Sequence, residues 1–346
     1  MVEPRPQEWK SLAKSIGNTP LVQYAGEVPQ GNKIWVKREC DNPFGSHYDR
    51  VYLDLFHHLE SQGTLKPNAR VLETTSGAAG VSFAGIGRLL GYECFVALPT
   101  GGERAREEAI RELLPSQDHL IFTPADQYVS GFPSFLRRFL AIHKDVVFLN
   151  HSMGPRDQET GKFTNNEVTL RALERITREV IEEISTDYFI PAVGNGSSVL
   201  GPARVLPNET KVIAFETVQS AVAYGLRYPG EYEKMFGITP GTLSRHRLPG
   251  TSYRGIEFPH IINAIEDGIV DEVILVSDAR MDDEYERITG KCETKRLPHW
   301  DMLLPDCVDV GRTTRAGISV ALEIAERVSE KNLLVIAYDK ASRYDS

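Results

Sequence analysis

Five consecutive residues carry the first chemically suggestive pattern of the chain: Ser46, His47, Tyr48, Asp49 and Arg50. They follow a short apolar strand and a polar turn, and they open a predicted helix. Ser46 is expected as its N-cap and Asp49 lies in the first turn, where the helix dipole favours a carboxylate. Side chains in the first turn of such a helix usually face a cleft. His47 and Tyr48 are therefore candidates for acid and base catalysis.

A glycine-rich turn after a predicted strand has the chemistry of a phosphate site. Glycines let backbone amides converge on an anion, and serine hydroxyls add further donors. Many turns of this kind bind nothing, so the pattern alone leaves a phosphate site and a simple packing turn open. The residues concerned are Gly194, Asn195, Gly196, Ser197 and Ser198.

A third candidate is a turn of small residues between the predicted strand 70–73 and a helix rich in alanine and glycine. Free backbone N–H groups at the start of that helix form an anion site by geometry and dipole. The alternative is a tight turn that only lets the helix approach the sheet. The turn contains Thr75, Ser76 and Gly77, followed by Ala78 and Ala79.

Strands and helices must alternate along most of the chain to position these three groups. Apolar runs and amphipathic stripes predict this alternation, which indicates an α/β protein with doubly wound, mainly parallel sheets. The predicted helices are 50–62, 104–114, 131–143 and 167–185, and the predicted strands are 70–73, 94–98, 119–124, 145–151, 188–193, 211–217 and 271–278.

Composition excludes several classes of protein. The chain has 346 residues, enough for two domains, with a net charge of −9 and no basic cluster, which argues against nucleic acid and anionic membranes as partners. Its four cysteines are scattered without ligand spacing, so we expect a reducing compartment and no metal. The first residues lack the apolar core of a signal peptide, and no apolar run is long enough to span a bilayer. A cytoplasmic protein is expected.

Several motifs together resemble the fold type II pyridoxal-phosphate (PLP) enzymes, the group of cysteine synthase, cystathionine β-synthase and threonine synthase. The resemblance is collinear from about residue 15 to 344. It rests on Ile-Gly-Asn-Thr-Pro-Leu at 16–21, Ser-His-Tyr-Asp-Arg at 46–50 for the family's Ser-x-Lys-Asp-Arg, Thr-Ser-Gly-Ala-Ala-Gly at 75–80 for Thr-Ser-Gly-Asn-Thr-Gly, the glycine-rich turn at 194–198, Gly-Ile-Ser at 317–319 and the last motif at 339–344.

The resemblance implies a role for each motif. In the family, the lysine at the position of Tyr48 forms the Schiff base with PLP, and the Asn at the position of Ala78 bonds the phenolic oxygen of the cofactor. Thr75, Ser76, Gly77 and Ala79 would hold the substrate carboxylate. Residues 194–198 would hold the cofactor phosphate, and Ser319 would face the pyridine nitrogen.

The family also implies an architecture. Residues 39–150 would form a smaller, mobile domain, and residues 1–38 with 151–346 a larger domain that carries the phosphate cup. The ligand would bind in the cleft between them, at the carboxyl ends of the strands. Family members are commonly homodimers, so a homodimer is expected.

The departures from the family concern the cofactor itself. Tyr48 cannot form an imine, and its phenol has an unperturbed pKa near 10 unless a cation such as Arg50 or a charged His47 lowers it. Lys37 lies on the preceding strand, where the family also has a lysine that is not the Schiff base. PLP is therefore implied by the resemblance but doubtful on these residues.

Three hypotheses remain open. The protein is a cysteine synthase-like protein of amino-acid metabolism with a diverged reaction on an amino-acid-like or phosphorylated ligand, as a lyase or transferase if PLP is used. Alternatively, it is a non-catalytic pseudoenzyme that binds a metabolite or a protein partner. Finally, an ordinary PLP enzyme has had its lysine replaced by engineering. The paired changes at Tyr48 and Ala78 favour divergence over a single engineered substitution.

Overall fold

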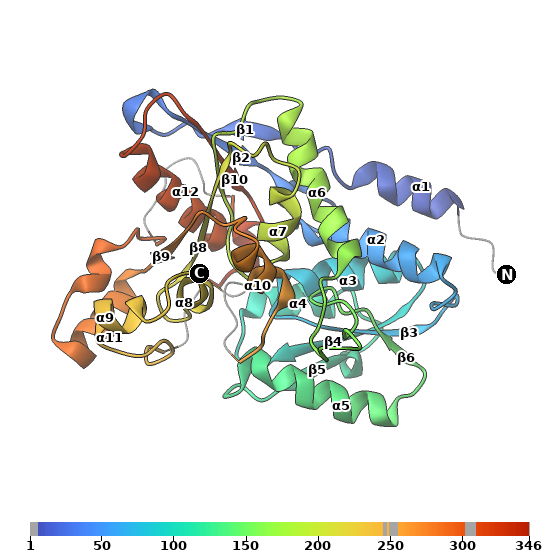
Figure 1. Cartoon of the computed structure of the whole chain (residues 1–346). Helices are drawn as coiled ribbons and strands as arrows, with labels where there is room; N and C mark the ends of the chain where they lie inside the picture. The colour runs from blue at the N-terminus through green and yellow to red at the C-terminus, as the bar shows by residue number, and fades with distance from the viewer. Residues whose placement is uncertain (1–5, 245–247, 249–254, 302–308, 346) are drawn as a thin grey trace.

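A computed structural model describes residues 6–244, 248, 255–301 and 309–345. Its strands form two sheets, one of six strands and one of four, with helices packed around both (Figure 1). The protein therefore has the predicted α/β class with mainly parallel sheets.

The smaller sheet has the order β5-β4-β3-β6, and all its neighbouring strands are parallel. Each strand is reached through a helical connection, as parallel pairing requires. Figure 1 shows α5 on one side of this sheet and α2, α3 and α4 on the other. The elements are α2 (Tyr48–Ser61), β3 (Arg70–Thr74), α3 (Ala78–Leu89), β4 (Glu93–Pro99), α4 (Arg104–Arg111), β5 (Leu120–Thr123), α5 (Phe132–Ile142) and β6 (Val146–Phe148).

The larger sheet has the order β1-β2-β10-β7-β8-β9, in which β1 is antiparallel to β2 and the other neighbours are parallel. Its central strands β10, β7 and β8 are mostly apolar and are buried except at their first residues, as expected of a sheet covered on both faces. Its elements are α1 (Pro6–Ser15), β1 (Leu21–Gln23), β2 (Lys33–Lys37), α6 (Glu167–Ile181), β7 (Tyr188–Ile190), α7 (Ser197–Ala203), β8 (Lys211–Thr217), α8 (Val222–Arg227), α9 (Glu231–Phe236), α10 (Pro259–Glu266), β9 (Glu272–Val276), α11 (Ala279–Thr289), α12 (Arg312–Ala325) and β10 (Asn332–Ile336).

The predicted elements all recur, with differences at their ends. The helix is assigned from Tyr48, but the backbone is already helical at His47, so Ser46 stands where the N-cap was expected. The Ser46 hydroxyl still accepts the N–H of Tyr48 at 3.1 Å and lies 2.9 Å from the hydroxyl of Ser82. Ser46 thus ties the first turn of α2 to α3.

The two sheets are built from different parts of the chain. All four strands of the smaller sheet lie between residues 70 and 148, and those of the larger sheet lie outside this range. Helix α2 packs against α3 of the smaller sheet and against α6 of the larger sheet, so it connects the two. The domain limits at residues 39 and 150 stay a prediction.

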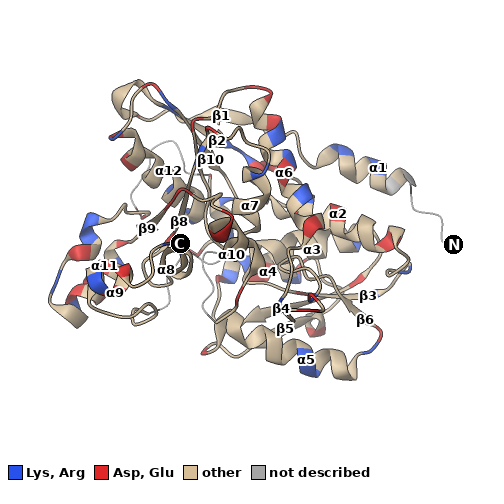
Figure 2. Ribbon diagram, viewed as in Figure 1, with Lys and Arg blue, Asp and Glu red and all other residues tan. Residues whose placement is uncertain are grey.

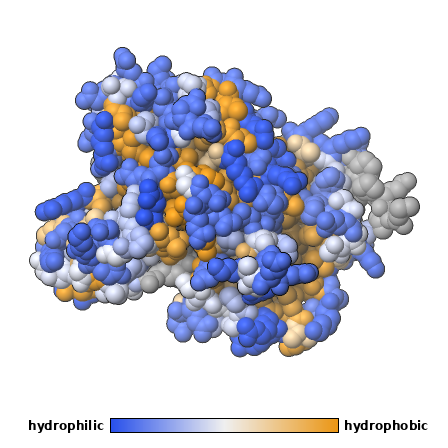
Figure 3. Space-filling view, viewed as in Figure 1, coloured by the Kyte–Doolittle hydropathy of each residue, from blue (hydrophilic) through white to orange (hydrophobic). Residues whose placement is uncertain are grey.

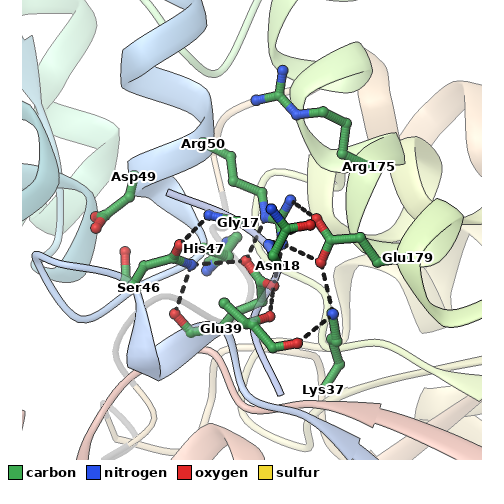
Figure 4. A network of polar contacts seen from close by, with 12 residues as sticks. Gly17, Asn18, Lys37, Glu39, Ser46, His47, Asp49, Arg50, Arg175 and Glu179 are labelled. Carbon is green, nitrogen blue, oxygen red and sulfur yellow. Dashed lines mark hydrogen bonds and ion pairs between the residues drawn. The ribbon is translucent and has the colours of Figure 1, made fainter. Parts of the chain in front are cut away.

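A buried network of four charged side chains fixes the position of α2 (Figure 4). The Arg50 guanidinium donates to both carboxylate oxygens of Glu39 at 2.7 and 2.8 Å, and to both of Glu179 on α6 at 2.6 and 2.8 Å. Lys37 at the end of β2 completes it, with its ammonium 2.7 Å from Glu179. Burial opposes ionisation of Glu179, but the hydrogen bonds and charges of Arg50 and Lys37 lower its pKa to about 2.

Positive and negative residues are mixed along the chain, with no large region of one charge in the view shown. Lys and Arg are interspersed with Asp and Glu along the ribbon in Figure 2, and the space-filling view in Figure 3 is hydrophilic over most of its area, with small apolar patches between. Across the part of the chain that the structure describes, every helix is too short or too polar to traverse a bilayer.

Candidate functional site

A cavity of about 430 Å³ lies where strands of both sheets end. Loops that follow β3, β6, β7 and β10 line it, together with the start of α2 and one side chain of α4. This is the crevice at the carboxyl ends of parallel strands where α/β proteins bind ligands. Nine of the predicted site residues line it: His47, Tyr48, Thr75, Ser76, Ala78, Ala79, Gly194, Asn195 and Ser198.

The first turn of α2 presents two aromatic rings to this cavity. His47 and Tyr48 lie with ring centroids 4.1 Å apart, and the edge of Tyr338 meets the His47 ring at 5.1 Å. The Nε2 atom of His47 lies 3.0 Å from the hydroxyl of Ser198 in the glycine-rich turn. The histidine therefore links the start of α2 to that turn.

Neither ring has the acid–base properties that the sequence suggested. Burial and the charge of Glu73 raise the pKa of Tyr48 above its ordinary value. Burial lowers the pKa of His47 to about 4, so this ring is neutral at pH 7. His47 carries no charge and Arg50 is committed to two carboxylates, so neither supplies the cation that would lower the pKa of Tyr48.

Lys37 does not extend into the cavity. Its side chain is 1% exposed, and its ammonium donates to the Thr19 carbonyl at 2.6 Å as well as pairing with Glu179. Among the described lining residues there is no lysine. The structure thus brings no side-chain amine to the place where Tyr48 stands.

The small-residue turn lies against a buried arginine that sequence reasoning missed. Gly77 leaves room for it: a Cβ at that position would lie 2.4 Å from Cδ of Arg106. Arg106 lines the cavity, is 3% exposed and donates to Asp339 at 2.8 Å, while its guanidinium stacks over Tyr344 at 4.5 Å. Gly77 itself does not line the cavity; its N–H donates to the Thr75 hydroxyl at 3.0 Å.

The Asn195 side chain takes up hydrogen-bond donors of the glycine-rich turn to which it belongs. The Asn195 amide oxygen accepts the backbone N–H of Ser197 at 2.9 Å and its hydroxyl at 2.7 Å. Helix α10 closes over Gly196, where a Cβ would lie 2.3 Å from the backbone nitrogen of Ile261. Gly196 and Ser197 are accordingly absent from the cavity lining, although the turn as a whole borders it.

Ser319 is not brought to the cavity. Its hydroxyl donates to the Arg315 carbonyl one turn earlier in α12, at 3.1 Å. The cavity is lined instead by side chains that the sequence analysis did not single out, among them Arg106, Asn150, His151, Ser152, Tyr338 and Asp339. Most of these follow strand ends, which is the one signal that could have marked them. Arg106 gave none, because five of the eight residues of its helix are charged.

A buried histidine behind the glycine-rich turn predicts a pH dependence. His260 on α10 accepts the backbone N–H of Asn166 at 2.9 Å, and burial lowers its pKa to about 3. Below pH 6.5 the unfolded chain binds a proton that the native state does not, so this histidine lowers the stability by about 1.4 kcal/mol for each pH unit until the pH reaches about 3. Above pH 6.5 the ring is neutral in both states and this loss is absent.

His260→Gln is therefore expected to flatten the fall in stability between about pH 6.5 and pH 4. The measurement is urea unfolding of both proteins across this range. Other titrating groups are common to both, so only the difference between the curves matters. Parallel curves for the two proteins would contradict the buried, neutral state of His260.

Comparison with known proteins assigns the chain to a family. The family model of pyridoxal-phosphate dependent enzymes matches residues 12–289, which is more than half of the chain. The chain therefore belongs to the pyridoxal-phosphate dependent enzyme family, as its motifs predicted.

Within this family the chain is similar to cysteine synthases. It is 25% identical to the cysteine synthase of Aquifex aeolicus over 95% of this chain and 87% of that protein. It is 26% identical to a probable cysteine synthase of Bacillus subtilis over 96% and 95% of the two chains. The crystal structure of an O-acetylserine dependent cystathionine β-synthase from Helicobacter pylori has the same fold, with a TM-score of 0.73 at 20% identity over 96% of each chain.

Proposed function

We propose that this protein is a diverged, cysteine synthase-like protein of amino-acid metabolism that binds a small ligand with a carboxylate or phosphate and transforms it without a lysine-bound cofactor. The observation that carries the proposal is a cavity in which a buried arginine flanks the retained Thr75–Gly77 turn while no lysine is found among its described lining residues. The names of the relatives, cysteine synthases, support a role in amino-acid chemistry.

The contacts around the cofactor position support the absence of an aldimine. PLP in its usual linkage needs an amine, and Tyr48 offers only a phenol whose pKa is raised by burial. Lys37 would have to leave a buried ion pair with Glu179, which costs several kcal/mol, of order 3–5. The side chain of Asn195 already uses the N–H of Ser197, and Ser319 bonds within its own helix. We infer that these residues do not fit a covalently bound PLP.

The contacts around Arg106 support an anionic ligand. Arg106 pairs with the buried Asp339, and its guanidinium places a positive charge in the cavity wall. Thr75 and Ser76 add hydroxyls on the same side of the cavity. A carboxylate is well matched to this set because guanidinium binds it through two hydrogen bonds. The ligand class expected is therefore a small amino acid or a phosphorylated relative.

The test of this proposal is a thermal-shift series with proteinogenic amino acids, O-acylated serines and phosphorylated metabolites, each with the matched uncharged amide or alcohol as control. Stabilisation by one of the anions and not by its uncharged control is the expected result. If none of the anions stabilises the protein, or if the uncharged control is as effective, the proposal fails.

Restoring the family's lysine alone is expected not to restore the family's reaction. Tyr48→Lys adds an amine, but Ala78 still offers no hydrogen-bond partner to the phenolic oxygen of PLP. The Asn195 side chain also still accepts the backbone N–H of Ser197, which a phosphate would need. The measurement is cysteine formation from O-acetylserine and sulfide. Turnover at the level of an ordinary cysteine synthase in this single variant would contradict the divergence of the site as a whole.

A protein that binds without catalysis is the second candidate. The pKa values of Tyr48 and His47 favour this candidate, because burial moves both away from pH 7 and neither ring exchanges a proton there. Mass spectrometry of a stabilising ligand after long incubation separates the two candidates, because only a catalyst changes it. A homodimer stays a prediction, which sedimentation velocity tests.

A further inference from the structure

A chain of three side chains crosses the cavity wall where β3 and β6 end. Glu73 is the penultimate residue of β3, and His151 and Ser152 follow the neighbouring parallel strand β6. The imidazole Nδ1 of His151 lies 3.2 Å from a carboxylate oxygen of Glu73, and its Nε2 lies 3.1 Å from the hydroxyl of Ser152. Carboxylate, imidazole and hydroxyl thus follow one another in the order that nucleophilic serines use.

The surrounding hydrogen bonds assign the direction of this chain. Glu73 is fully buried, and its two oxygens accept the N–H groups of Thr74 at 2.8 Å and of His151 at 3.3 Å. An ionised carboxylate only accepts, so the imidazole proton belongs on Nδ1, which also lies 3.0 Å from the hydroxyl of Tyr52. The Nε2 atom is then the acceptor for the hydroxyl proton of Ser152.

Ser152 lines the cavity, and its hydroxyl oxygen also accepts a hydrogen bond from a second side chain. The Asn195 amide donates to its oxygen at 3.2 Å, which leaves the hydroxyl hydrogen for His151. Both Ser152 and Asn195 line the cavity, and Ser152 is half-buried rather than enclosed. The hydroxyl is therefore open to a small molecule in the cavity.

We propose that Ser152 is a nucleophile, with His151 as its general base and Glu73 as the positioning residue, and that the substrate class is a small carboxylic ester. The Ser152 oxygen forms a bond to the acyl carbon while its proton passes to His151 Nε2. The ester bond breaks, and the alcohol leaves with that proton. Water then attacks the acyl-serine by the same route and releases the carboxylic acid.

This activity goes beyond the proposed function and does not need its ligand. The probes are diisopropyl fluorophosphate and p-nitrophenyl acetate. With the first, the serine oxygen bonds to phosphorus as fluoride leaves and the proton passes to His151. The expected result is one phosphoryl group per chain, located on Ser152 by peptide mass spectrometry, and acetyl ester hydrolysis that the same reagent abolishes.

Variants separate this role from simple packing. Ser152→Ala is expected to remove labelling and hydrolysis, and His151→Asn to slow labelling by about 100-fold or more while both variants keep the parent's circular dichroism. The matched control is Ser116→Ala: Ser116 lies 2.9 Å from His119, which lies 3.1 Å from Glu93, so the same residue types meet at an exposed place outside the cavity. This control is expected to label like the parent.

Labelling at Ser116 or at any other serine, no labelling at all, or unchanged labelling in Ser152→Ala would overturn the proposal. None of these results bears on the binding of an anion at Arg106, because thermal stabilisation of Ser152→Ala by such an anion is measured separately. If no anion stabilises the protein against heat but Ser152 is still labelled, the proposed function is rejected and the role of Ser152 as nucleophile is retained.

Discussion

Replacing Arg50 by methionine is expected to lower the free energy of unfolding by about 3–5 kcal/mol. Arg50 is 1% exposed and neutralises Glu39, which is fully buried, and part of the charge of Glu179. Without the guanidinium, the side-chain donors left to Glu39 among the described residues are the hydroxyl of Thr19 and the amide of Asn42. An uncompensated charge is then left inside the protein, and this penalty exceeds the loss of the hydrogen bonds themselves.

The control for this substitution is Arg175→Met. Arg175 pairs with Asp54 at 2.9 Å on the same helix pair, but it is 41% exposed, so its removal is expected to cost less than about 1 kcal/mol. Adding Glu39→Gln to Arg50→Met is expected to recover part of the loss because it removes the buried charge. Equal costs for the two arginines in urea unfolding would contradict the structural role of the network.

Replacing Arg106 by glutamine is expected to weaken binding of a carboxylate ligand by about tenfold to hundredfold, the value of a hydrogen-bonded charge. The reason is its place beside the Thr75–Gly77 turn, at the wall of the cavity. Affinity is measured by titration calorimetry with an anion found by the thermal-shift series. Arg106→Lys keeps the charge but not the planar fork, so an intermediate affinity is expected.

The matched control for Arg106 is Arg137→Gln. Arg137 also lines the cavity but is exposed to solvent, which screens its charge. Its replacement is expected to change affinity by less than about threefold. Affinities of Arg106→Gln and the parent that agree within this factor would place the ligand elsewhere. A urea unfolding curve for each variant separates lost binding from lost folding, since Asp339 loses a partner in Arg106→Gln.

The fold could be predicted from the sequence because its signals are local. Apolar runs marked the strands, and the start of α2, the Thr75–Gly77 turn and the Gly194–Ser198 turn were located by strand-to-helix transitions. All three meet at one cavity because parallel strands end on one side. The cap of α2 is also local, since the Ser46 hydroxyl accepts the N–H of Tyr48 two residues on.

The ion pairs and the burial of the charged side chains could not be predicted from local patterns. Arg50 and Lys37 were noticed only as charges near Tyr48, and no pattern pointed to Glu179. Arg50 nevertheless meets Glu179 across 129 positions, and Glu179 also pairs with Lys37, the lysine that might have replaced Tyr48. Arg106 is one of five charged residues in an eight-residue helix, and its burial depends on the C-terminal residues that pack on it. Such pairs depend on tertiary contacts that no spacing rule reports.

The central claim, binding without a lysine-bound cofactor, is tested most directly by absorption spectroscopy of the purified protein before and after addition of PLP, followed by borohydride reduction and peptide mapping. The account predicts no visible aldimine band and no reduced pyridoxyl group on any lysine of a folded protein. A visible band that borohydride fixes to a lysine, Lys37 above all, would contradict it and return the chain to ordinary PLP chemistry.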